Sequence, residues 1–175
     1  MKVIALGHRA RQGKDSVARN IVKFAGAMDV YAKQYAFADA LKAYCRVAYG
    51  MTSKDAKLLQ TVGTEIYKDH VKRDFWTHVL SHQLDEEQPD IAIISDLRYP
   101  DEYEFVKSHH GTTIRVVRYV NNQQFISQDR DPNHRSEIAL ADDKYWDYTI
   151  ANDGDLLDLQ ARVKLFLTQQ FVEPW

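Results

Sequence analysis

The sequence predicts an α/β domain with a mainly parallel sheet, because short apolar runs alternate with segments whose apolar residues recur at helical spacing. Residues 90–95 (DIAIIS) form the clearest buried strand. Residues 2–6 (KVIAL) form another, which is short, apolar and bounded by Gly7, and a helix-spaced segment follows after a polar turn. The length of 175 residues fits a single domain, 1–175, with room for a substantial core.

The remaining elements follow in chain order from the same two patterns. Helical spacing predicts helices over residues 15–27, 38–49, 53–67, 75–84 and 155–171. Further short strands are expected at residues 34–37, 113–119 and 148–151, which makes five strands in all. Because parallel sheets bind ligands beyond the carboxyl ends of their strands, we expect the site near Gly7, Asp96 and Asn152.

Composition argues against several classes of protein. The net charge of −2 gives no support for a broad nucleic-acid or membrane-binding surface, and we expect neither partner. No apolar run approaches the roughly 18 residues of a membrane span, and the first residues lack a signal-peptide pattern. Cys45 is the single cysteine, so we expect no disulfide framework and a reducing, cytoplasmic location.

The turn from Gly7 to Lys14 is rich in donors, and a strand, turn and helix in this order can cradle phosphates. Lys14 would reach the β- and γ-phosphates, as in the motif G-x-x-x-x-G-K-[ST]. His8 replaces the first glycine of that motif, and Asp15 replaces its magnesium-binding hydroxyl residue, a role that a carboxylate can take. The alternative is an ordinary connection with an incidental lysine. The residues expected to hold the phosphates here are Arg9, Ala10, Arg11, Gln12, Gly13, Lys14, Asp15 and Ser16.

Residues 120–133 (VNNQQFISQDRDPN) are polar, lack a sustained period and contain Pro132. Such a stretch is either a surface loop or a mobile lid over the site, because long loops in compact domains are often binding elements. The stretch by itself leaves both interpretations open.

Several stretches occur together in one order: G-K-D-S after the Arg-rich loop, FADALK at 37–42, LLQTVGTEIY with FW at 58–76, SDLRYPDE at 95–102, HRSE at 134–137 and IANDGDL at 150–156. This set resembles the deoxynucleoside monophosphate kinases of tailed bacteriophages, members of the P-loop nucleoside monophosphate kinase group. The resemblance implies a P-loop kinase fold, three-layer α/β/α, with a mainly parallel five-stranded sheet. It also implies an acceptor-binding helical region at about 38–88 and a lid at about 119–136.

The resemblance implies a reaction as well. Kinases of this kind move the γ-phosphoryl group of ATP to a (deoxy)nucleoside monophosphate with Mg²⁺, by positioning and charge neutralisation rather than by a covalent intermediate. Phage nucleotide supply in the host cytoplasm is the expected setting, and a homodimer is a plausible assembly. Two rivals are a P-loop kinase for another phosphorylated small molecule and a nucleotide-triggered ATPase or binding protein. GTPases of the second kind usually carry an N-K-x-D motif, which this sequence lacks.

Two residues at the end of the clearest strand take roles from the resemblance. Asp96 would touch a magnesium-bound water, which makes it a metal-site and acceptor-site candidate beside Asp15. Arg98 would grip the acceptor phosphate. Glu102, one helical turn further, is expected to be a carboxylate at a helix start, favoured by the helix dipole.

The predicted helical region offers further acceptor contacts, each with a structural alternative. Asp39 and Lys42 share a helix face and either meet the acceptor or form a surface ion pair. Arg73 and Trp76 belong to a basic-aromatic group that could hold the monophosphate and stack its base, although aromatic residues at helical spacing more often belong to the core. Gln60 either lines the same pocket or lies on a polar helix face.

The expected lid brings further cations to the site. Arg130 and Arg135 are the preferred candidates for contacting the transferring phosphoryl group, and the lid would also exclude water. Glu137 would position the lid or the acceptor, and Asn152, in the loop that passes the adenine in related kinases, would contact ATP. The expected catalytic residues are therefore Lys14, Arg98, Arg130 and Arg135.

Overall fold

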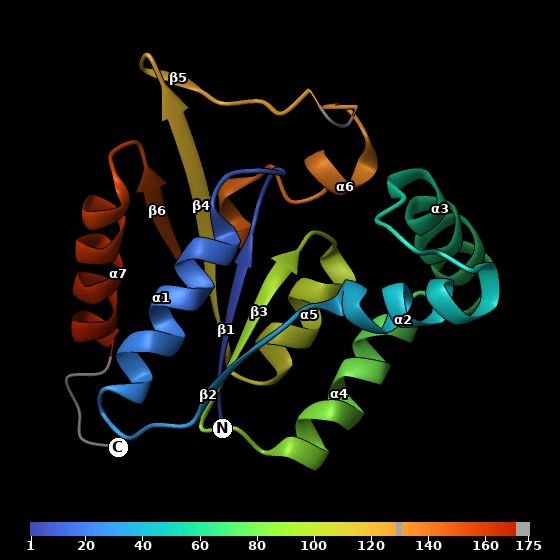
Figure 1. Cartoon of the computed structure of the whole chain (residues 1–175), viewed down its shortest axis with the longest axis horizontal. Coiled ribbons are helices and arrows are strands. Elements are labelled where there is room, and N and C mark those ends of the chain that lie inside the picture. Colours follow the sequence, from blue (N-terminus) through green and yellow to red (C-terminus); the bar gives the residue numbers. More distant parts are fainter. Residues whose placement is uncertain (129–130, 171–175) are drawn as a thin grey trace.

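The computed structural model describes residues 1–128 and 131–170, and in them a six-stranded sheet lies between layers of helices (Figure 1). The strands are β1 (Lys2–Gly7), β2 (Ala32–Tyr35), β3 (Ile91–Leu97), β4 (Thr112–Val120), β5 (Gln123–Gln124) and β6 (Tyr148–Asn152). The α-helices are α1 (Lys14–Gly26), α2 (Phe37–Tyr49), α3 (Ala56–Gln60), α4 (Phe75–Glu87), α5 (Pro100–Ser108), α6 (Arg135–Ile138) and α7 (Leu156–Gln170). A π-helix, η1 (Thr61–Val71), and a 3₁₀-helix, η2 (Asp143–Tyr145), complete the order.

The predicted parallel sheet of five strands is confirmed, in the order β2-β3-β1-β4-β6. β1 lies at the centre, where Ile4 pairs with Ile93 of β3 on one side and Thr112 of β4 on the other. β5 adds a short antiparallel pairing at the far end of β4. Because the five strands are parallel, their carboxyl ends meet at one edge of the sheet, where the loop after β1 lies.

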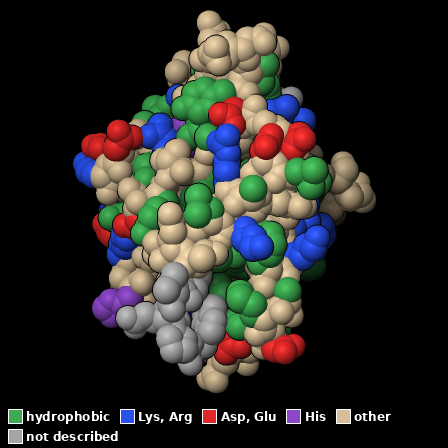
Figure 2. Space-filling model, turned by 90° about the vertical axis from the view of Figure 1, so that its left-hand side faces the viewer, with side chains coloured by type: hydrophobic (Ala, Val, Ile, Leu, Met, Phe, Trp, Pro, Cys, Tyr) green, Lys and Arg blue, Asp and Glu red, His purple; other side chains and the backbone are tan. Residues whose placement is uncertain are grey.

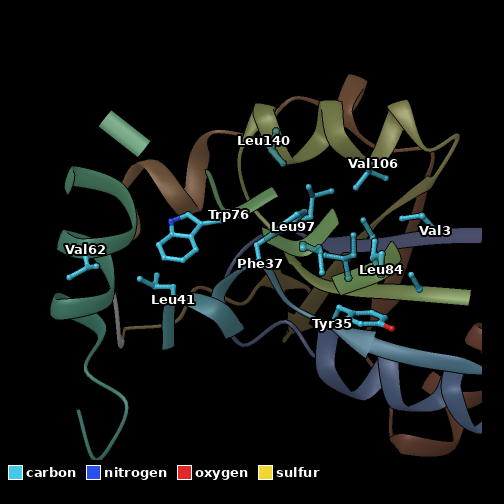
Figure 3. Close-up of a cluster of buried hydrophobic side chains, with 14 of the residues drawn as sticks. Val3, Tyr35, Phe37, Leu41, Val62, Trp76, Leu84, Leu97, Val106 and Leu140 are labelled. Atoms are coloured by element: carbon cyan, nitrogen blue, oxygen red, sulfur yellow. The ribbon is translucent and has the colours of Figure 1, made fainter. Parts of the chain in front are cut away.

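The side chains on the two faces of β1 belong to two separate hydrophobic cores, so the sheet has helices packed on both sides. Ile4 and Leu6 pack with the helices α1 and α7 on one face. Val3 and Ala5 alternate with them and pack with α2, α4 and α5 on the other face (Figure 3). Burial of each large aliphatic side chain of this kind contributes about 1.5–3 kcal/mol, so the alternation alone commits β1 to the middle layer.

The helices α2, α3 and η1 extend away from the sheet edge, on the right of Figure 1, and α4 returns the chain to the sheet. Figure 2 views the molecule from the α7 side, where acidic and basic side chains lie interspersed with apolar ones. Across the described residues, no helix has both the length and the apolar character that a membrane crossing requires.

The predicted strand at 34–37 is displaced, because β2 ends at Tyr35 and Phe37 already begins α2. The cause is a long-range contact: the Asp96 carboxylate accepts hydrogen bonds from the backbone N–H groups of Phe37 at 2.8 Å and Ala38 at 3.0 Å. A carboxylate in this position caps the helix from outside its own segment. Sequence spacing near Phe37 carries no sign of that partner.

The predicted single helix at 53–67 is wrong in form, because the short helix α3 passes into the π-helix η1, which continues to Val71. Gly63 lies in η1, and a Cβ atom there would be 2.4 Å from Leu41 Cδ2 of α2. The glycine therefore permits close packing between η1 and α2. A π-helix has a wider turn than an α-helix and is frequent at functional sites.

The polar stretch at 120–133 begins as a hairpin rather than as irregular chain. Asn121 and Asn122 have φ of 51° and 60°, and they turn β4 back into β5, where Tyr119 pairs with Gln124. Positive φ at both central residues is the requirement of the tight hairpin turn that Asn favours. A strand of two residues is too short to show alternation, so the sequence pattern missed it.

Candidate functional site

The chain between β1 and α1 is held in a conformation that few residue types adopt readily. His8, in the motif position of the first glycine, has φ of 88°, Arg11 has φ of 57° and Gly13 has φ of 100°. A Cβ atom on Gly13 would meet Asn152 Nδ2 at 2.4 Å, so the glycine is required by space as well as by φ. No side chain caps the start of α1, which leaves the first amides of that helix for another acceptor.

Lys14, the first residue of α1, is buried beneath this loop. Its ammonium donates hydrogen bonds to the carbonyl oxygens of Arg9 at 2.6 Å and His8 at 3.3 Å. Burial, followed by the nearby Arg98 guanidinium, lowers the pKa of Lys14 to about 7. A cation held this close to deprotonation in the free protein gains strongly from an anion placed beside it.

His8 is buried and links the loop to the hairpin of β4 and β5. Burial, then the positive charges of Arg115 and Arg9, lower the pKa of His8 to about 3, so the imidazole is neutral at pH 7. Its ring nitrogens lie 3.3 Å from Arg115 Nη2 and 3.4 Å from Gln124 Nε2. The side chain therefore tethers the loop, while its backbone supplies the positive φ of the missing glycine.

Gln12 is fully buried, and its side chain serves the hairpin. Nε2 donates to the carbonyl of Phe125 at 2.7 Å, and Oε1 accepts from the backbone N–H of Arg118. The carboxamide of Asn152 donates to the Gln12 carbonyl at 3.0 Å, which brings the end of β6 against the loop. Gln12 can therefore offer an anion its backbone N–H rather than its side chain.

A cavity of about 530 Å³ opens between this loop, the end of β3 and the helices α2, α3 and η1. The loop side of its wall includes Ala10, Arg11, Lys14 and Asp15. The strand-end side includes Ser95, Asp96, Arg98 and Tyr99, and Ser136 of α6 also lines the cavity. The helical side includes Phe37, Leu41, Lys42, Gln60, Gly63, Thr64, Lys68 and Trp76. The volume and the mixture of apolar wall and convergent charges are those of a small-molecule site.

Arg98 enters this cavity from the turn that follows β3. Its Nη1 atom donates to the carbonyl of Ser136 at 3.1 Å and forms an ion pair with Glu137. Glu137 is itself buried, and its Oε2 accepts from the backbone N–H of Ala10 at 2.7 Å. The predicted site residues Arg98 and Glu137 therefore lie together beside the loop between β1 and α1, which is called the phosphate-type loop below.

Asp15 and Asp96 both line the cavity, and their carboxylates are the groups there that could bind magnesium. Each oxygen of Asp96 accepts one hydrogen bond, from the backbone N–H of Phe37 or of Ala38. Burial raises the pKa of Asp96 above its usual value, although these two hydrogen bonds oppose the shift. Asp15 accepts from Gln34 Nε2 at 3.1 Å. Carboxylate oxygens keep further lone pairs, and Mg²⁺ usually takes one or two protein carboxylates with phosphates and waters, so these residues fit.

No cluster of three or more His, Cys, Asp and Glu residues that could hold a metal occurs in residues 1–128 and 131–170.

Sequence reasoning missed a buried charged group on the cavity wall. Lys68 of η1 donates to Asp101 Oδ2 and Glu102 Oε1, both at 2.8 Å, and its Nζ lies 4.0 Å from the centre of the Tyr99 ring. Burial lowers the pKa of Lys68, but Glu102 and Asp101 outweigh it and hold the pKa above the usual value. Glu102 was expected only as a helix-start carboxylate; it fulfils that role and also binds Lys68.

The other predicted residues fall in different places. Asp39 and Lys42 form the exposed ion pair at 2.7 Å, and Lys42 also lines the cavity. Trp76 is buried in the core and reaches the cavity wall, with Nε1 donating to the Gly63 carbonyl at 3.1 Å. Arg73 is exposed and lies outside the residues that line the cavity.

The remaining predicted residues belong to the expected lid and to the loop between β1 and α1. Arg135 pairs with Asp69 of η1 at 3.2 Å, and Arg9 donates to the Pro132 carbonyl at 3.2 Å. Ser16 accepts from Arg19 at 3.2 Å. Arg130 lies outside the described residues.

Comparisons with known proteins identify the family. Residues 56–163, more than half of the chain, match the family described as deoxynucleotide monophosphate kinase. The chain is 29% identical over 109 residues to the deoxynucleoside-5′-monophosphate kinase of Escherichia phage T5, an alignment that covers 61% of this chain and 42% of that protein. The chain therefore matches less than half the length of that curated relative.

Solved structures with a similar fold include two shikimate kinases and an APS kinase. The shikimate kinase of Acinetobacter baumannii superposes with a TM-score of 0.58 at 14% identity, covering 99% of this chain and 96% of that one. The enzyme of Aquifex aeolicus gives 0.53 at 14% identity, covering 98% and 99%. The APS kinase of Mycobacterium tuberculosis gives 0.53 at 12% identity, covering 96% and 97%. These likenesses show the P-loop kinase fold, and the match over residues 56–163 shows that the chain belongs to the deoxynucleotide monophosphate kinase family.

Proposed function

We propose that the protein transfers the γ-phosphoryl group of ATP to the phosphate of a (deoxy)nucleoside monophosphate. The observation that carries the proposal is the convergence of Lys14, Asp96 and Arg98 on one cavity of about 530 Å³. Family membership supports the acceptor class, and the named phage T5 relative supports the same reaction. The loop that contains Lys14 precedes the matched region, so its role rests on geometry.

ATP would bind along the loop and the start of α1. Backbone N–H groups of the loop would bind phosphate oxygens there, and the ammonium of Lys14 would exchange its carbonyl partners for phosphate oxygens. Asn152 lies against Gln12 and Gly13, where it would flank the nucleotide. The donor-site residues proposed are Arg9, Ala10, Arg11, Gln12, Gly13, Lys14, Asp15, Ser16 and Asn152.

Asp15 and Asp96 would hold Mg²⁺ through their free lone pairs. When bound, the ion would neutralise phosphate charge and align the two reacting phosphates. Asp96 would do so from a fixed position, because both of its oxygens accept hydrogen bonds from the start of α2.

The acceptor would lie across the cavity with its phosphate toward Arg98. Arg98 offers a planar guanidinium that suits a phosphate, and Lys42 adds a second cation on the helical side of the cavity. Phe37, Leu41 and Trp76 supply an apolar surface for the base. The acceptor-site residues proposed are Asp39, Lys42, Arg73, Trp76, Asp96, Arg98 and Glu137, of which Asp39 and Arg73 stay predictions that no contact supports.

Catalysis in this arrangement needs no covalent step by the protein. Lys14 and Arg98 would stabilise charge on the phosphoryl group in transit, and Arg130 and Arg135 would approach with the segment 119–136 as a lid. Closure would exclude water and so favour transfer over hydrolysis of ATP. We propose this lid and an acceptor region at about 38–88 as parts of a single domain, 1–175.

The cellular setting is part of the same proposal. A buried free thiol at Cys45 fits a reducing compartment such as the host cytoplasm. A homodimer stays a prediction.

A coupled assay for ADP, with ATP, Mg²⁺ and each of dAMP, dCMP, dGMP and dTMP, tests the proposal. ADP that forms only with a monophosphate supports the kinase, whereas ADP formed without any acceptor favours an ATPase. No turnover with any nucleotide acceptor would favour a kinase for another phosphorylated compound. Lys14→Met keeps the apolar stem, and we expect it to lower turnover by on the order of 10²–10³-fold or more, with an unchanged circular dichroism spectrum.

A further inference from the structure

Glu137 occupies a position between the two halves of the site. Its side chain is 5% exposed and belongs to the first turn of α6. Oε2 accepts from the backbone N–H of Ala10 in the phosphate-type loop at 2.7 Å, and Oε1 forms the ion pair with Arg98. One carboxylate thus bridges the proposed donor side and the proposed acceptor side.

The partners of this carboxylate are groups that a phosphoryl group in transit would use. Ala10 lies in the loop between His8 and Lys14, and Arg98 is the proposed acceptor-phosphate ligand. Lys14 is close enough that Glu137 and Arg98 shift its pKa in opposite directions. The Glu137 carboxylate therefore already places a negative charge where the transferred phosphate must be stabilised.

A phosphate and this carboxylate cannot share the same donors. Both are negative, and repulsion between like charges is strong where water is excluded. Arg98 Nη1 and the Ala10 N–H are both occupied by Glu137, so a terminal phosphate can use these two donors only after Glu137 withdraws. The withdrawal exposes the Ala10 amide to the incoming anion in the same step.

The segment that carries Glu137 is short, and its contacts on the outer side are weak. α6 has four residues, and its N-cap is the side chain of His134, which accepts from the Ser136 N–H at 3.2 Å. Its outer contact is the Arg135–Asp69 pair, whose side chains are 54% and 39% exposed. Exposed pairs of this kind contribute little to stability.

We infer that Glu137 is a coupling residue: in the nucleotide-free protein it holds Arg98 and the Ala10 amide, and the terminal phosphate of ATP displaces it and releases Arg98 to the acceptor. The inference rests on the proposed function and adds a binding order to it. By linkage, ATP then raises the affinity for the monophosphate, and the monophosphate raises the affinity for ATP by the same factor.

Calorimetric titration of the full chain with Mg²⁺ and either ATP or ADP, without acceptor, tests the displacement. In Glu137→Gln the charge is gone while the shape is kept, so we expect ATP to bind about tenfold tighter and ADP to change by less than about threefold. Glu104→Gln removes the same charge from an exposed position on α5 and should leave both dissociation constants unchanged. Thermal unfolding of each variant checks that it is folded.

A second variant and a second measurement cover the case in which Glu137→Gln does not fold. Glu137→Asp keeps the charge but is one methylene shorter, so it cannot reach both Ala10 and Arg98, and it should also tighten ATP. Binding of each dNMP with and without the β,γ-imido analogue of ATP gives the coupling factor. We expect that factor to exceed one in the natural protein and to fall toward one in either variant.

The outcomes separate this inference from the proposed function. If ATP affinity is unchanged or weaker in the variants, and only the monophosphate binds less tightly, Glu137 is a simple acceptor contact and the coupling is refuted. The kinase proposal would survive that result if the natural protein still phosphorylates a dNMP. If the natural protein binds neither ATP nor ADP, the kinase proposal and the coupling by Glu137 are both refuted.

Discussion

The ammonium of Lys68 lies 2.8 Å from Oε1 of Glu102, in a buried contact that joins η1 to the start of α5. The second oxygen of Glu102 accepts from the backbone N–H groups of Arg98 at 2.8 Å and Tyr99 at 3.1 Å. One wall of the cavity and the turn that presents Arg98 are therefore tied to the same carboxyl group. Burial raises the pKa of Glu102 to about 7, although Lys68 opposes the shift.

The raised pKa makes stability depend on pH through Glu102. Between pH 4.5 and 7 the folded protein holds a proton there that the unfolded chain has released, so the free energy of unfolding falls as pH rises. From pH 5 to pH 8, we expect the natural protein to lose about 1–3 kcal/mol relative to Glu102→Gln, which has no such proton. Urea unfolding of both proteins at the two pH values measures this loss.

Glu104→Gln, an exposed change on the same helix, serves as the control and should follow the natural protein at both pH values. A stability difference between the natural protein and Glu102→Gln that stays constant from pH 5 to pH 8 would show that Glu102 does not titrate in this interval.

Gly63→Ala should weaken binding of the monophosphate and leave binding of ATP nearly unchanged. The new Cβ atom would lie 2.4 Å from Leu41 Cδ2, so the end of that leucine must turn, and Leu41 lines the cavity. We expect the KM for the monophosphate to rise by about three- to tenfold while the KM for ATP stays within twofold, since overpacking of about 1–3 kcal/mol is shared between stability and binding. Steady-state kinetics with each substrate varied in turn measures both constants.

Adding Leu41→Val to Gly63→Ala removes about the volume that was added, and we expect it to recover most of the lost acceptor affinity. Gly26→Ala is the matched control, because no atom lies within 4 Å of the added Cβ. Gly63→Ala kinetics indistinguishable from those of Gly26→Ala would mean that this wall does not touch the acceptor.

Lys14 should take up a proton when ATP binds. Its pKa is lowered to about 7 in the free protein, so a fraction of the molecules lack the charge at pH 7.5, and a bound triphosphate restores it. The apparent affinity for ATP should therefore fall as pH rises from 7 to 9. Titration calorimetry at pH 7.5 in two buffers of different ionisation enthalpy measures the uptake.

Lys14→Met has no proton to gain, so the buffer dependence that belongs to Lys14 should be absent from it, whatever ATP affinity it retains. Equal proton uptake in the natural protein and in Lys14→Met would assign the proton to another group.

The parts of this structure that follow from local pattern were predictable. β1 is recognisable because residues 2–6 form a short apolar run bounded by Gly7, and the loop after it is recognisable because Gly13 and Lys14 keep motif spacing. These signals depend on neighbours within a few residues. They suffice for the order of strands and helices and for the position of the phosphate-type loop.

Contacts between distant segments were not predictable, and they decide the details. Lys68 meets acids 33 and 34 residues away, and the Gln12 side chain meets the chain 106 and 113 residues away. Asp96 begins α2 from 58 and 59 residues away, which displaced the predicted second strand. A side chain whose partner is supplied by tertiary packing has no periodic signature of its own.

His8 offers a direct test of backbone strain in the loop, because its φ of 88° suits glycine and its side chain packs at the same time. His8→Gly and His8→Ala both lose the contacts with Arg115 and Gln124. Only alanine keeps a Cβ atom at positive φ, which costs about 1–2 kcal/mol. We therefore expect His8→Gly to be more stable than His8→Ala by about 1 kcal/mol in urea unfolding, against the usual order.

Val47 provides the reference pair, since it lies in α2 and is 89% exposed. In an exposed helix, Val47→Ala should be more stable than Val47→Gly by about 1 kcal/mol, because glycine loses more backbone entropy. Alanine should therefore be the less stable substitution at position 8 and the more stable one at position 47. Suppose instead that His8→Ala is as stable as His8→Gly or more so, while Val47→Ala is more stable than Val47→Gly. The loop would then adopt a negative φ at His8 in solution, and His8 would not replace the motif glycine in conformation.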